Sequence, residues 1–433
     1  MGVKCNLGCA YCYETDMRDA GNFGPKGYDL TRMQMALSAE IGSDRGGSWT
    51  LHGGEPLLMP VEDVEAMWKW GHERGQSLGV QTNGALITER HVDLAKRYGV
   101  HVGVSIDGPG DMNDLRSRAT LEKTREATAA SQRAIRMLRG AGVPTSVIVV
   151  LHKLNVDPAR RDEFKAWIRE LSDLGVSGIR FHPMEIDARA AEYAPGMDEY
   201  IEFYRDMRRF MDTLPRLRID VIEDVRALLR GQDNQTTCTW NACDPYTTAA
   251  VQGVDGEGNR TNCGRTMKDG VAHPKADRAG YERYVALYHT PQEAGGCQGC
   301  RFFAMCSGQC PGEGIDGDWR NRSMYCALYM ALFEDIEAEM VAAGETPVSV
   351  APDRADIERT MVEHWARGQR LQIHSARRVL AGGAGGDQHA DAPHGDSHGD
   401  HTDNAPQTHA DRCHGDSHGD SDDPEWRRQN GLS

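Results

Sequence analysis

Two groups of closely spaced cysteines are the residues of this sequence best suited to chemistry. The first group is CNLGCAYC at 5–12, in which Cys5, Cys9 and Cys12 follow a CxxxCxxC pattern. Three thiolates cannot fill the four corners of a tetrahedral site, but they suit a [4Fe–4S] cluster that keeps one iron open to another ligand. A zinc site completed by a distant histidine is the alternative interpretation.

The second group lies in the C-terminal half, where CQGCRFFAMCSGQC at 297–310 holds four cysteines. Cys238, Cys243, Cys263 and Cys326 bring this group to eight, the number of thiols needed for two fully ligated [4Fe–4S] clusters. A pair of zinc knuckles would use the same cysteines. The sequence starts without an apolar signal segment, so we expect a reducing cytoplasm, where disulfides are rare.

Charge and composition exclude several classes of partner. The formal net charge of the 433-residue chain is -16, which argues against nucleic acid and against anionic membranes. No run of about 18 apolar residues occurs, so we expect no membrane-spanning segment. The length is enough for one large α/β barrel and a smaller module.

The elements that must position the first group alternate between short apolar runs and amphipathic stretches. The predicted strands are 48–52, 78–82, 101–106, 145–151 and 178–183, and the helices between them include 61–74, 123–139 and 162–175. Such alternation is typical of βαβ units around a parallel sheet. We therefore predict an α/β fold with a partial (β/α)6 TIM-like barrel over 1–230. Only four residues precede Cys5, so the first strand is either absent or truncated.

The rest of the chain divides into three further predicted segments. Residues 231–345 form a Cys-rich domain, 346–381 a C-terminal helical segment, and 382–433 a disordered tail rich in His, Asp and Gly. Helical patterns cover 197–231, 327–343 and 353–380.

Polar motifs follow three of the predicted strands. HGGEPLL (52–58) comes directly after the first strand, QTNG (81–84) ends the second, and SIDGP (105–109) ends the third. The two glycines allow a ligand to approach the backbone, Glu55 can accept from an ammonium group, and SIDGP offers a hydroxyl and a carboxylate to a ribose. Each motif alone could be an ordinary turn or helix entry, but barrels build their sites at these strand ends.

On these motifs the chain resembles radical S-adenosylmethionine (SAM) enzymes over about residues 1–230. The resemblance implies that Cys5, Cys9 and Cys12 hold a [4Fe–4S] cluster whose open iron chelates SAM. An electron, from a donor such as flavodoxin or ferredoxin, would then cleave SAM to give a 5′-deoxyadenosyl radical that abstracts hydrogen from a substrate. The implied SAM contacts are Tyr11 at the adenine, Gly53, Gly54 and Glu55 at the methionine amino group, Ser105 and Asp107 at the ribose, and Gln81 and Asn83 nearby.

The eight C-terminal cysteines resemble the SPASM extension of this superfamily, cysteine for cysteine. The resemblance implies two auxiliary [4Fe–4S] clusters, and three clusters in total. The implied ligands are Cys238, Cys243, Cys263 and Cys310 for the nearer cluster, and Cys297, Cys300, Cys306 and Cys326 for the outer one. Because eight thiolates would saturate both clusters, we favour electron transfer over substrate binding as their role.

The overall pattern is close to that of anaerobic sulfatase-maturating enzymes, with one departure. In those enzymes an Asp serves as the base directly after the cysteine aligned with Cys263, whereas this sequence has Gly264. No replacement base can be named from the sequence. We interpret Glu313, Asp316 and Asp318 as solvated, and Arg265 and Lys268 as surface charges rather than substrate clamps.

The tail contains a repeat, because HADAPHGDSHGD (389–400) recurs as HADRCHGDSHGD (409–420). One interpretation is a solvated low-complexity segment, and a second is a weak site for nickel, zinc or cobalt. A third is a substrate peptide tethered to its modifying enzyme, since a short flexible linker gives an effective concentration of about millimolar.

We predict an oxidoreductase that cross-links or oxidises a ribosomally made precursor peptide or a protein, with its own tail as one candidate substrate. A dehydrogenase of a small molecule or of a sulfatase-type side chain is the alternative enzyme. An iron–sulfur electron carrier and a metal-trafficking protein are the non-enzymatic alternatives. Several products begin with the same hydrogen abstraction, so the sequence does not predict the bond formed.

Overall fold

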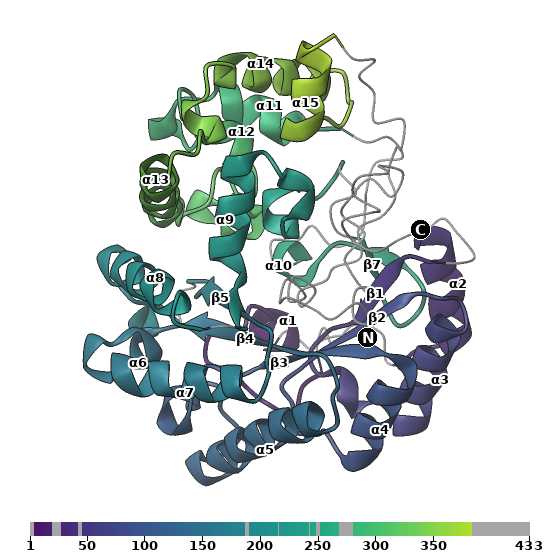
Figure 1. Ribbon diagram of the computed structural model, residues 1–433. Helices are drawn as coiled ribbons and strands as arrows, with labels where there is room; N and C mark the ends of the chain where they lie inside the picture. The colour runs from purple at the N-terminus through teal and green to yellow at the C-terminus, as the bar shows by residue number, and fades with distance from the viewer. Residues whose placement is uncertain are drawn as a thin grey trace.

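A six-stranded parallel sheet forms the N-terminal half of the protein, as the computed structural model shows (Figure 1). The structure describes residues 4–19, 27–41, 46–186, 190–214, 216–241, 243–247, 252–267 and 280–382. The strands follow one another in chain order across the sheet, and this confirms the predicted partial barrel. Their bounds are β1 Ser48–Leu51, β2 Ser77–Thr82, β3 Val100–Ser105, β4 Thr145–Leu151, β5 Gly178–Pro183 and β6 Arg218–Ile219.

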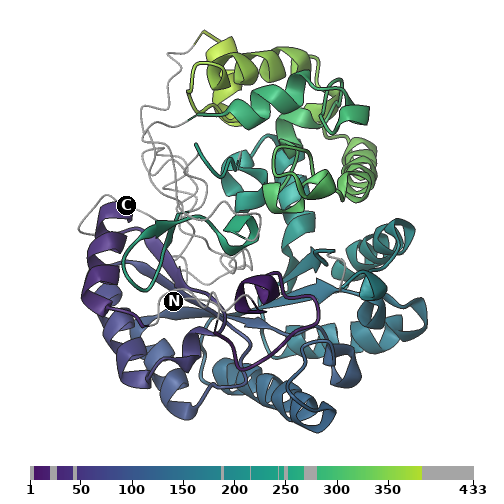
Figure 2. The ribbon, with the colours of Figure 1, turned by 180° about the vertical axis from the view of Figure 1, so that it is seen from behind.

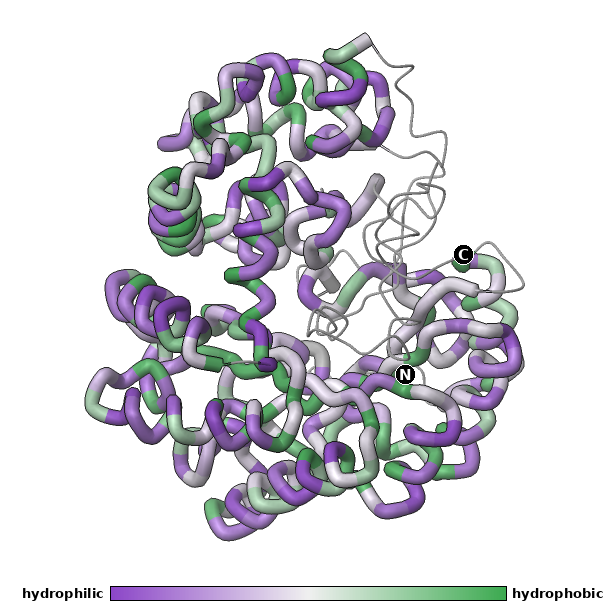
Figure 3. Tube along the Cα trace, in the orientation of Figure 1, coloured by the Kyte–Doolittle hydropathy of each residue, from purple (hydrophilic) through white to green (hydrophobic). Residues whose placement is uncertain are grey.

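Helices return the chain from one strand to the next and cover the outer face of the curved sheet (Figure 1). β4, with the sequence TSVIVVL, has six of its seven residues buried, as is typical of parallel strands. Hydrophobic and hydrophilic residues alternate along the surrounding helices (Figure 3). These helices are α2 Leu30–Ile41, α3 Val61–His72, α4 Glu89–Tyr98, α5 Leu121–Gly140, α6 Lys153–Val156, α7 Arg161–Asp173, α8 Met197–Met211 and α9 Asp220–Arg230.

The five predicted strands are confirmed, but the prediction of one continuous helical stretch over 197–231 is wrong. The two-residue strand β6 separates α8 from α9 and pairs with β5. Leu217 and Ile219 are fully buried there, so tertiary packing fixes an extended segment that is too short to leave a pattern in the sequence. The sixth strand of the sheet is therefore β6, and residues 1–3 lie outside the described part of the chain.

Helices and one two-stranded hairpin make up the C-terminal half, which lies above the sheet in Figure 1. The predicted helix over 353–380 is broken into two, because the backbone at Gly368 has a φ of +71°. None of the described helices is both long enough and apolar enough to cross a membrane. The repeat tail lies outside the described residues. The elements are β7 Gly253–Val254, β8 Arg260–Thr261, α10 Gly264–Met267, α11 Glu282–His289, α12 Phe303–Cys306, α13 Cys326–Ala342, α14 Arg354–Trp365 and α15 Ile373–Leu380.

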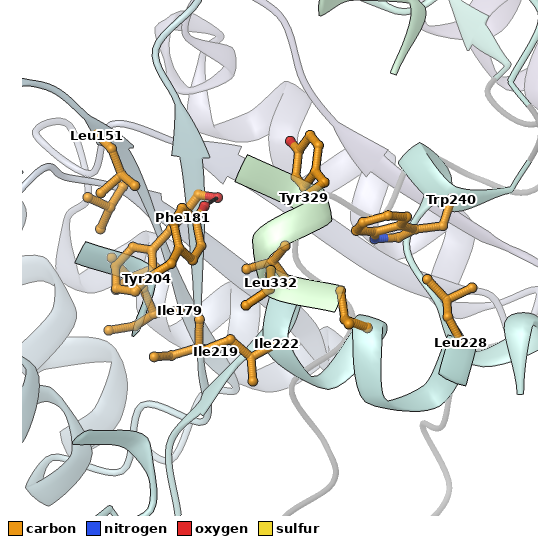
Figure 4. Close-up of a cluster of buried hydrophobic side chains, with 14 of the residues drawn as sticks. Leu151, Ile179, Phe181, Tyr204, Ile219, Ile222, Leu228, Trp240, Tyr329 and Leu332 are labelled. Carbon is orange, nitrogen blue, oxygen red and sulfur yellow. Dashed lines mark hydrogen bonds between the residues drawn. The ribbon is translucent and has the colours of Figure 1, made fainter. Parts of the chain in front are cut away.

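One hydrophobic core continues from the sheet into the C-terminal half. Helix α13 packs against α8 and α9, and Figure 4 shows Tyr329 and Leu332 of α13 among side chains that extend from Phe181 of β5 to Trp240. The hydroxyl of Tyr325 also donates to the backbone carbonyl of Met184, just after β5. Shared burial of this kind fixes the two halves relative to each other.

A buried carboxyl group lies where α9 meets the Cys-rich region. Oδ2 of Asp224 accepts hydrogen bonds from Oγ1 of Thr237 (2.8 Å) and from Nε1 of Trp240 (2.9 Å). Burial, and then the neighbouring Asp220 carboxylate, raise the pKa of Asp224 to about 7, although Arg180 acts to lower it. Asp224 is therefore near its titration midpoint at neutral pH.

We expect Asp224→Asn to change the pH dependence of stability. Between about pH 4 and pH 7, Asp224 is protonated in the folded chain and ionised in the unfolded chain. The contribution of this proton to the free energy of unfolding is therefore complete below about pH 4 and is lost as the pH rises to about 7. Relative to the wild type, the free energy of unfolding of the variant should rise by on the order of 1.4 kcal/mol per pH unit across this interval. Denaturant titrations at several pH values measure it.

Asp93→Asn, at an exposed position of α4, is the control and should leave the pH profile unchanged. A constant stability difference between Asp224→Asn and the wild type from pH 4 to 8 would contradict this interpretation of Asp224.

Candidate active site

A cavity lies where the C-terminal ends of the strands meet the cysteine loop, residues 4–14. This edge of a parallel sheet is where such folds assemble their sites. The loop continues into the short helix α1 Thr15–Asp19, and Figure 2 shows this purple segment between the sheet and the C-terminal half. The strand-end residues that line the cavity are His52, Gly53, Gly54, Gln81, Thr82, Asn83, Ser105, Ile148, Val150, His182, Pro183 and Glu185.

The cysteine loop brings Cys5, Cys9 and Cys12 to the cavity wall. Backbone hydrogen bonds of 2.8 Å hold it in place, from Gly8 to the carbonyl of Ser117 and from Ala10 to that of Leu115. A further bond of 2.8 Å joins the N–H of Glu55 to the carbonyl of Lys4. The loop is therefore attached both to the segment after β3 and to the segment after β1.

The surroundings of these thiols fit a metal-bound thiolate. Sγ of Cys5 accepts from the N–H of Leu7 at 3.4 Å and from Nδ2 of Asn83 at 3.8 Å. Burial raises the pKa of Cys9 to about 12, and the Arg116 guanidinium opposes this shift. Without metal Cys9 is therefore a thiol, and binding a cluster would release its proton.

Among the residues that the structure describes, no three Cys, His, Asp or Glu side chains are grouped tightly enough to hold one metal ion. A [4Fe–4S] cluster does not require such grouping, because each cysteine binds a different iron. The donor set of three thiols at one cavity thus remains compatible with a cluster.

Asp107, which the sequence places at the ribose, lies behind the cavity wall and is fully buried. Its carboxylate accepts from the hydroxyl of Tyr11 and from the N–H of Val150 (2.9 Å), and lies 3.7 Å from Arg116 and 3.5 Å from His152. Burial opposes ionisation, but Arg116, His152 and Tyr11 outweigh it and lower the pKa of Asp107. Asp107 thus fixes the ring of Tyr11, which does line the cavity and stacks on His152.

Glu55 likewise does not line the cavity. Oε1 accepts from the N–H of Leu57 (3.0 Å) and from Oγ1 of Thr82 (2.7 Å), and Oε2 accepts from the N–H of Asn83 (2.8 Å). These bonds tie the turn after β1 to the end of β2. Gly53, whose φ of +139° favours glycine, begins that turn and faces the cavity.

Gln81 and Ser105 are adjacent in the cavity wall. Nε2 of Gln81 donates to Oγ of Ser105 at 2.7 Å, across neighbouring strands β2 and β3. Both side chains line the cavity, as the sequence predicts for residues beside a bound nucleoside. Their hydroxyl and amide groups leave further donors and acceptors for a ligand.

A second cavity lies in the Cys-rich region and brings together the four cysteines predicted to hold the outer cluster. Aromatic rings of Phe302, Phe303 and Phe333 complete its wall. Burial, and then the neighbouring Cys300 thiol, raise the pKa of Cys297 to about 12. The cysteines that line this cavity are Cys297, Cys300, Cys306 and Cys326.

Cys310 does not line the second cavity, although it lies in the same short sequence stretch. Burial raises its pKa to about 12; the next largest influence is Arg265, which opposes the shift, and Cys263 is also close enough to act on it. Cys238 acts electrostatically on Arg180, and Cys243 on Tyr284. A nearer cluster held by Cys238, Cys243, Cys263 and Cys310 stays a prediction.

The expectation that Arg265 and Glu313 are surface charges is wrong. Arg265 is 7% exposed and Glu313 is 3% exposed. Nε of Arg265 donates to Glu185 at 2.5 Å, and Nη2 donates to Glu313 at 2.6 Å, so an ion pair with each carboxylate compensates their burial. Asp316 is exposed as expected, and Lys268 lies outside the described residues.

Gly264 has a steric reason to lack a side chain. A Cβ atom at this position would lie 2.9 Å from Cε2 and 3.0 Å from the hydroxyl oxygen of Tyr13. Tyr13 lines the cavity, so its ring covers the place that an acidic side chain at 264 would need.

Several residues that line the cavity were not predicted from the sequence. Tyr13 and Glu14 directly follow Cys12, and burial raises the pKa of Glu14 to about 7. Arg116 comes from the loop after β3, and His182 and Glu185 from the end of β5. Position after a recognised motif could have indicated the first two, and position at the end of a predicted strand could have indicated the last two.

The sequence of this chain is similar to a known superfamily model and to several known proteins. Residues 1–164 match the model of the Radical SAM superfamily. An uncharacterised protein of Synechocystis sp. is 27% identical over 352 residues, which are 74% of this chain and 83% of that protein. The serine-type anaerobic sulfatase-maturating enzyme of Klebsiella aerogenes is 24% identical over 362 residues, 78% of this chain and 84% of that enzyme.

Among solved structures, native anSMEcpe with bound AdoMet and the Kp18Cys peptide has a similar fold. The TM-score is 0.61, with 18% sequence identity over 79% of this chain and 96% of that chain. The likeness extends beyond the sheet, because it covers far more of the chain than the 164 residues that match the superfamily model.

We expect Glu55→Gln to destabilise the fold, because one of the two carboxylate oxygens becomes an N–H₂ group facing a buried donor. Leaving such a donor unpaired costs about 1–3 kcal/mol in the free energy of unfolding, which denaturant titration measures. Glu73→Gln, at an exposed position after α3, is the matched control and should change stability by less than about 0.5 kcal/mol. Full stability of Glu55→Gln with a large loss of SAM affinity would instead assign Glu55 to ligand binding.

Proposed function

We propose that this chain is a radical SAM enzyme, and that it is a SPASM-type maturase that oxidises or cross-links a peptide or protein side chain. The observation that carries the proposal is a single cavity that joins three cysteines of one loop to polar strand-end side chains. When bound, a [4Fe–4S] cluster and SAM supply a 5′-deoxyadenosyl radical through one-electron cleavage of the sulfonium C–S bond.

The residues of the cavity divide into groups with different tasks in this proposal. Cys5, Cys9 and Cys12 hold the cluster, and the backbone at Gly53 and Gly54 meets the methionine end of SAM. The remaining proposed SAM contacts are Gln81, Asn83 and Ser105 near the ribose and Tyr11 at the adenine. Glu55 and Asp107 act through these residues, because each carboxylate is held by protein donors behind the wall.

Arg116 supplies positive charge to the same wall. Its guanidinium donates to the hydroxyl of Tyr11 at 3.0 Å and lies close enough to Cys9 to stabilise a thiolate there. A buried guanidinium beside the thiolates also suits the carboxylate of a bound amino acid moiety.

A peptide substrate is supported by the fold relationship, since anSMEcpe has been solved with a peptide. The cavity lies between the sheet and the C-terminal half, where Tyr13, Glu185 and Arg265 line it. We propose that the eight C-terminal cysteines would hold two auxiliary clusters, which would supply an electron acceptor for the substrate, and that flavodoxin or ferredoxin would supply the first electron.

A sulfatase-type oxidation is the second candidate, because curated relatives carry the name of sulfatase-maturating enzymes. The wall at Gly264 argues against it: no acidic side chain stands there, and Tyr13 occupies the space. Dehydrogenation of a small molecule is compatible with the same cavity and lacks a supporting observation of its own.

The repeat at 389–400 and 409–420 is one candidate substrate of this enzyme. We expect anaerobic incubation with SAM and a reductant to form 5′-deoxyadenosine and to lower the mass of tail peptides by two hydrogens per oxidation or cross-link. Mass spectrometry of the digested protein measures both. Turnover with unchanged tail masses would eliminate the tail, and added genomic-neighbour peptides would then be tested in trans.

We expect Cys12→Ala to abolish 5′-deoxyadenosine formation and to lower iron by about four from roughly twelve per chain, four for each cubane. Cys306→Ala should lower iron by a similar amount through the outer cluster and leave the SAM-binding cluster in place. Iron analysis and EPR measure both. Cys413→Ala, at the one cysteine outside the proposed sets, is the control for iron content. Equal iron in all three variants would contradict the ligand assignment.

A further inference from the structure

The cysteine loop faces the cavity on one side and solvent on the other. Leu7 and Cys9 line the cavity, whereas Gly8 between them does not. Gly8 is the one exposed residue among residues 5–12, all of which the structure describes. Because glycine has no side chain, a protein that docks at Gly8 meets the backbone of the loop directly.

The segment after β3 provides the surface next to Gly8. The N–H of Gly8 donates to the carbonyl of Ser117 at 2.8 Å, and the hydroxyl of Ser117 donates to the carbonyl of Gly8. The following residues, 118–121, are all exposed. The paired hydrogen bonds hold this segment beside the loop, so Gly8 and residues 118–121 form one surface, which we call the Gly8 face.

The Gly8 face combines an apolar side chain with a cation. Leu121, the first residue of α5, is 56% exposed, and Arg118 is exposed beside it in the chain. A single exposed leucine is common on protein surfaces and carries no argument by itself. An apolar contact with charged residues around it is, however, the usual composition of a protein–protein interface.

The charge around the Gly8 face is opposite in sign to that of the whole chain. Residues 4–13 and 115–121 contain Lys4, Arg116 and Arg118 and no acidic residue, although the chain has a formal net charge of -16. Arg116 is directed inward to Tyr11, whereas Lys4 and Arg118 are exposed. A local positive surface on an acidic protein favours an acidic partner and orients it on approach.

We propose that the Gly8 face docks the acidic carrier protein that delivers the electron for SAM cleavage. The inference rests on the proposed function, which consumes one electron per cleavage, and it adds the surface at which the donor binds. The donor loses one electron, and the C–S bond of SAM accepts it and breaks to methionine and the 5′-deoxyadenosyl radical.

Distance favours this face over other parts of the surface. The rate of electron transfer falls steeply with the separation of donor and acceptor, so the donor must dock close to the loop that carries Cys5, Cys9 and Cys12. Gly8 is where that loop is exposed, and it follows Cys5 by three residues and precedes Cys9 directly.

The position of the Gly8 face also leaves the cavity free for a substrate. Neither Gly8 nor any of residues 118–121 lines the cavity, whereas Tyr13, Glu185 and Arg265 line it near the C-terminal half. A carrier protein on the Gly8 face therefore does not compete with a substrate, and both can be bound when the electron is transferred.

The first test is calorimetric binding of oxidised flavodoxin, an acidic one-electron carrier, to the reconstituted holoenzyme with SAM. Arg118→Glu reverses the charge of the face, so we expect Kd to rise about 10-fold at low ionic strength. The difference should shrink at about 0.5 M salt, because salt screens exposed charges. Arg133→Glu is the control, since it makes the same charge change at an exposed position of α5, about 18 Å along the helix from Leu121, and should leave Kd unchanged.

The same measurement tests the apolar part of the Gly8 face. We expect Leu121→Ser to raise Kd about 3- to 10-fold at both low and high salt, because this contact does not depend on charge. Leu380→Ser, at a 44% exposed position of α15, is the matched control and should bind like the wild type. An unchanged Kd in either Arg118→Glu or Leu121→Ser would overturn the proposal.

The second test compares two reductants in the formation of 5′-deoxyadenosine. With limiting reduced flavodoxin, Arg118→Glu should be about 10-fold slower than the wild type. With saturating dithionite, a small reductant that needs no docking face, the two proteins should react at the same rate. An equal loss with both reductants would overturn the proposal, because Arg118 would then support the cysteine loop itself.

Two further results would also overturn the proposal. One is the lack of binding between flavodoxin and the wild-type protein at low salt. The other is a salt-dependent dimer of the protein that Arg118→Glu dissociates, which would assign the face to a second copy of this chain. Failure to form 5′-deoxyadenosine with dithionite would instead contradict the proposed function, while calorimetry still decides whether the Gly8 face binds a carrier protein.

Discussion

The carboxylate of Asp107 is the interaction on which the cavity depends. It is fully buried, and it binds at once to the cysteine loop through Tyr11, to β4 through Val150, and to the guanidinium of Arg116. A buried charge is tolerated only where donors and cations compensate it, so these partners must stay in place for the fold to stand. The same bonds set the position of Tyr11 between Cys9 and Cys12.

The carboxylate of Glu55, in the turn after β1, is held in a similar way. Glu55 and Asp107 together show that a carboxylate in a recognised motif can support the site without facing the ligand. Both carboxylates follow a strand and both look from the sequence like ligand contacts, yet their oxygens accept hydrogen bonds from protein donors. The ligand-facing groups are their neighbours, such as Gly53 and Ser105. Preorganisation of this kind places rigid support behind the groups that touch a ligand.

Local patterns in the sequence were enough to predict five strands, the parallel sheet and the strand-end position of the site, because each has a short-range signal. They were not enough to predict β6, because two residues are too few to show an alternation of apolar and polar side chains. Nor were they enough to predict the burial of Arg265. That burial depends on Glu185 and Glu313, which lie 80 and 48 residues away along the chain. Compensation between distant charges has no local signature, so an arginine beside a turn looks solvated until the fold is known.

Arg265 also connects two places where the proposed chemistry would occur. It lines the cavity beside the cysteine loop, and it lies close enough to Cys310 to interact electrostatically with that side chain. The ion pairs of Arg265 with Glu185 and Glu313 join the end of β5 to the Cys-rich region at this part of the cavity wall. A substrate bound in the cavity would therefore lie beside residues from both halves of the protein. The two halves must keep a fixed relative position for the cavity to keep its shape, and these buried ion pairs provide one of the connections that hold them.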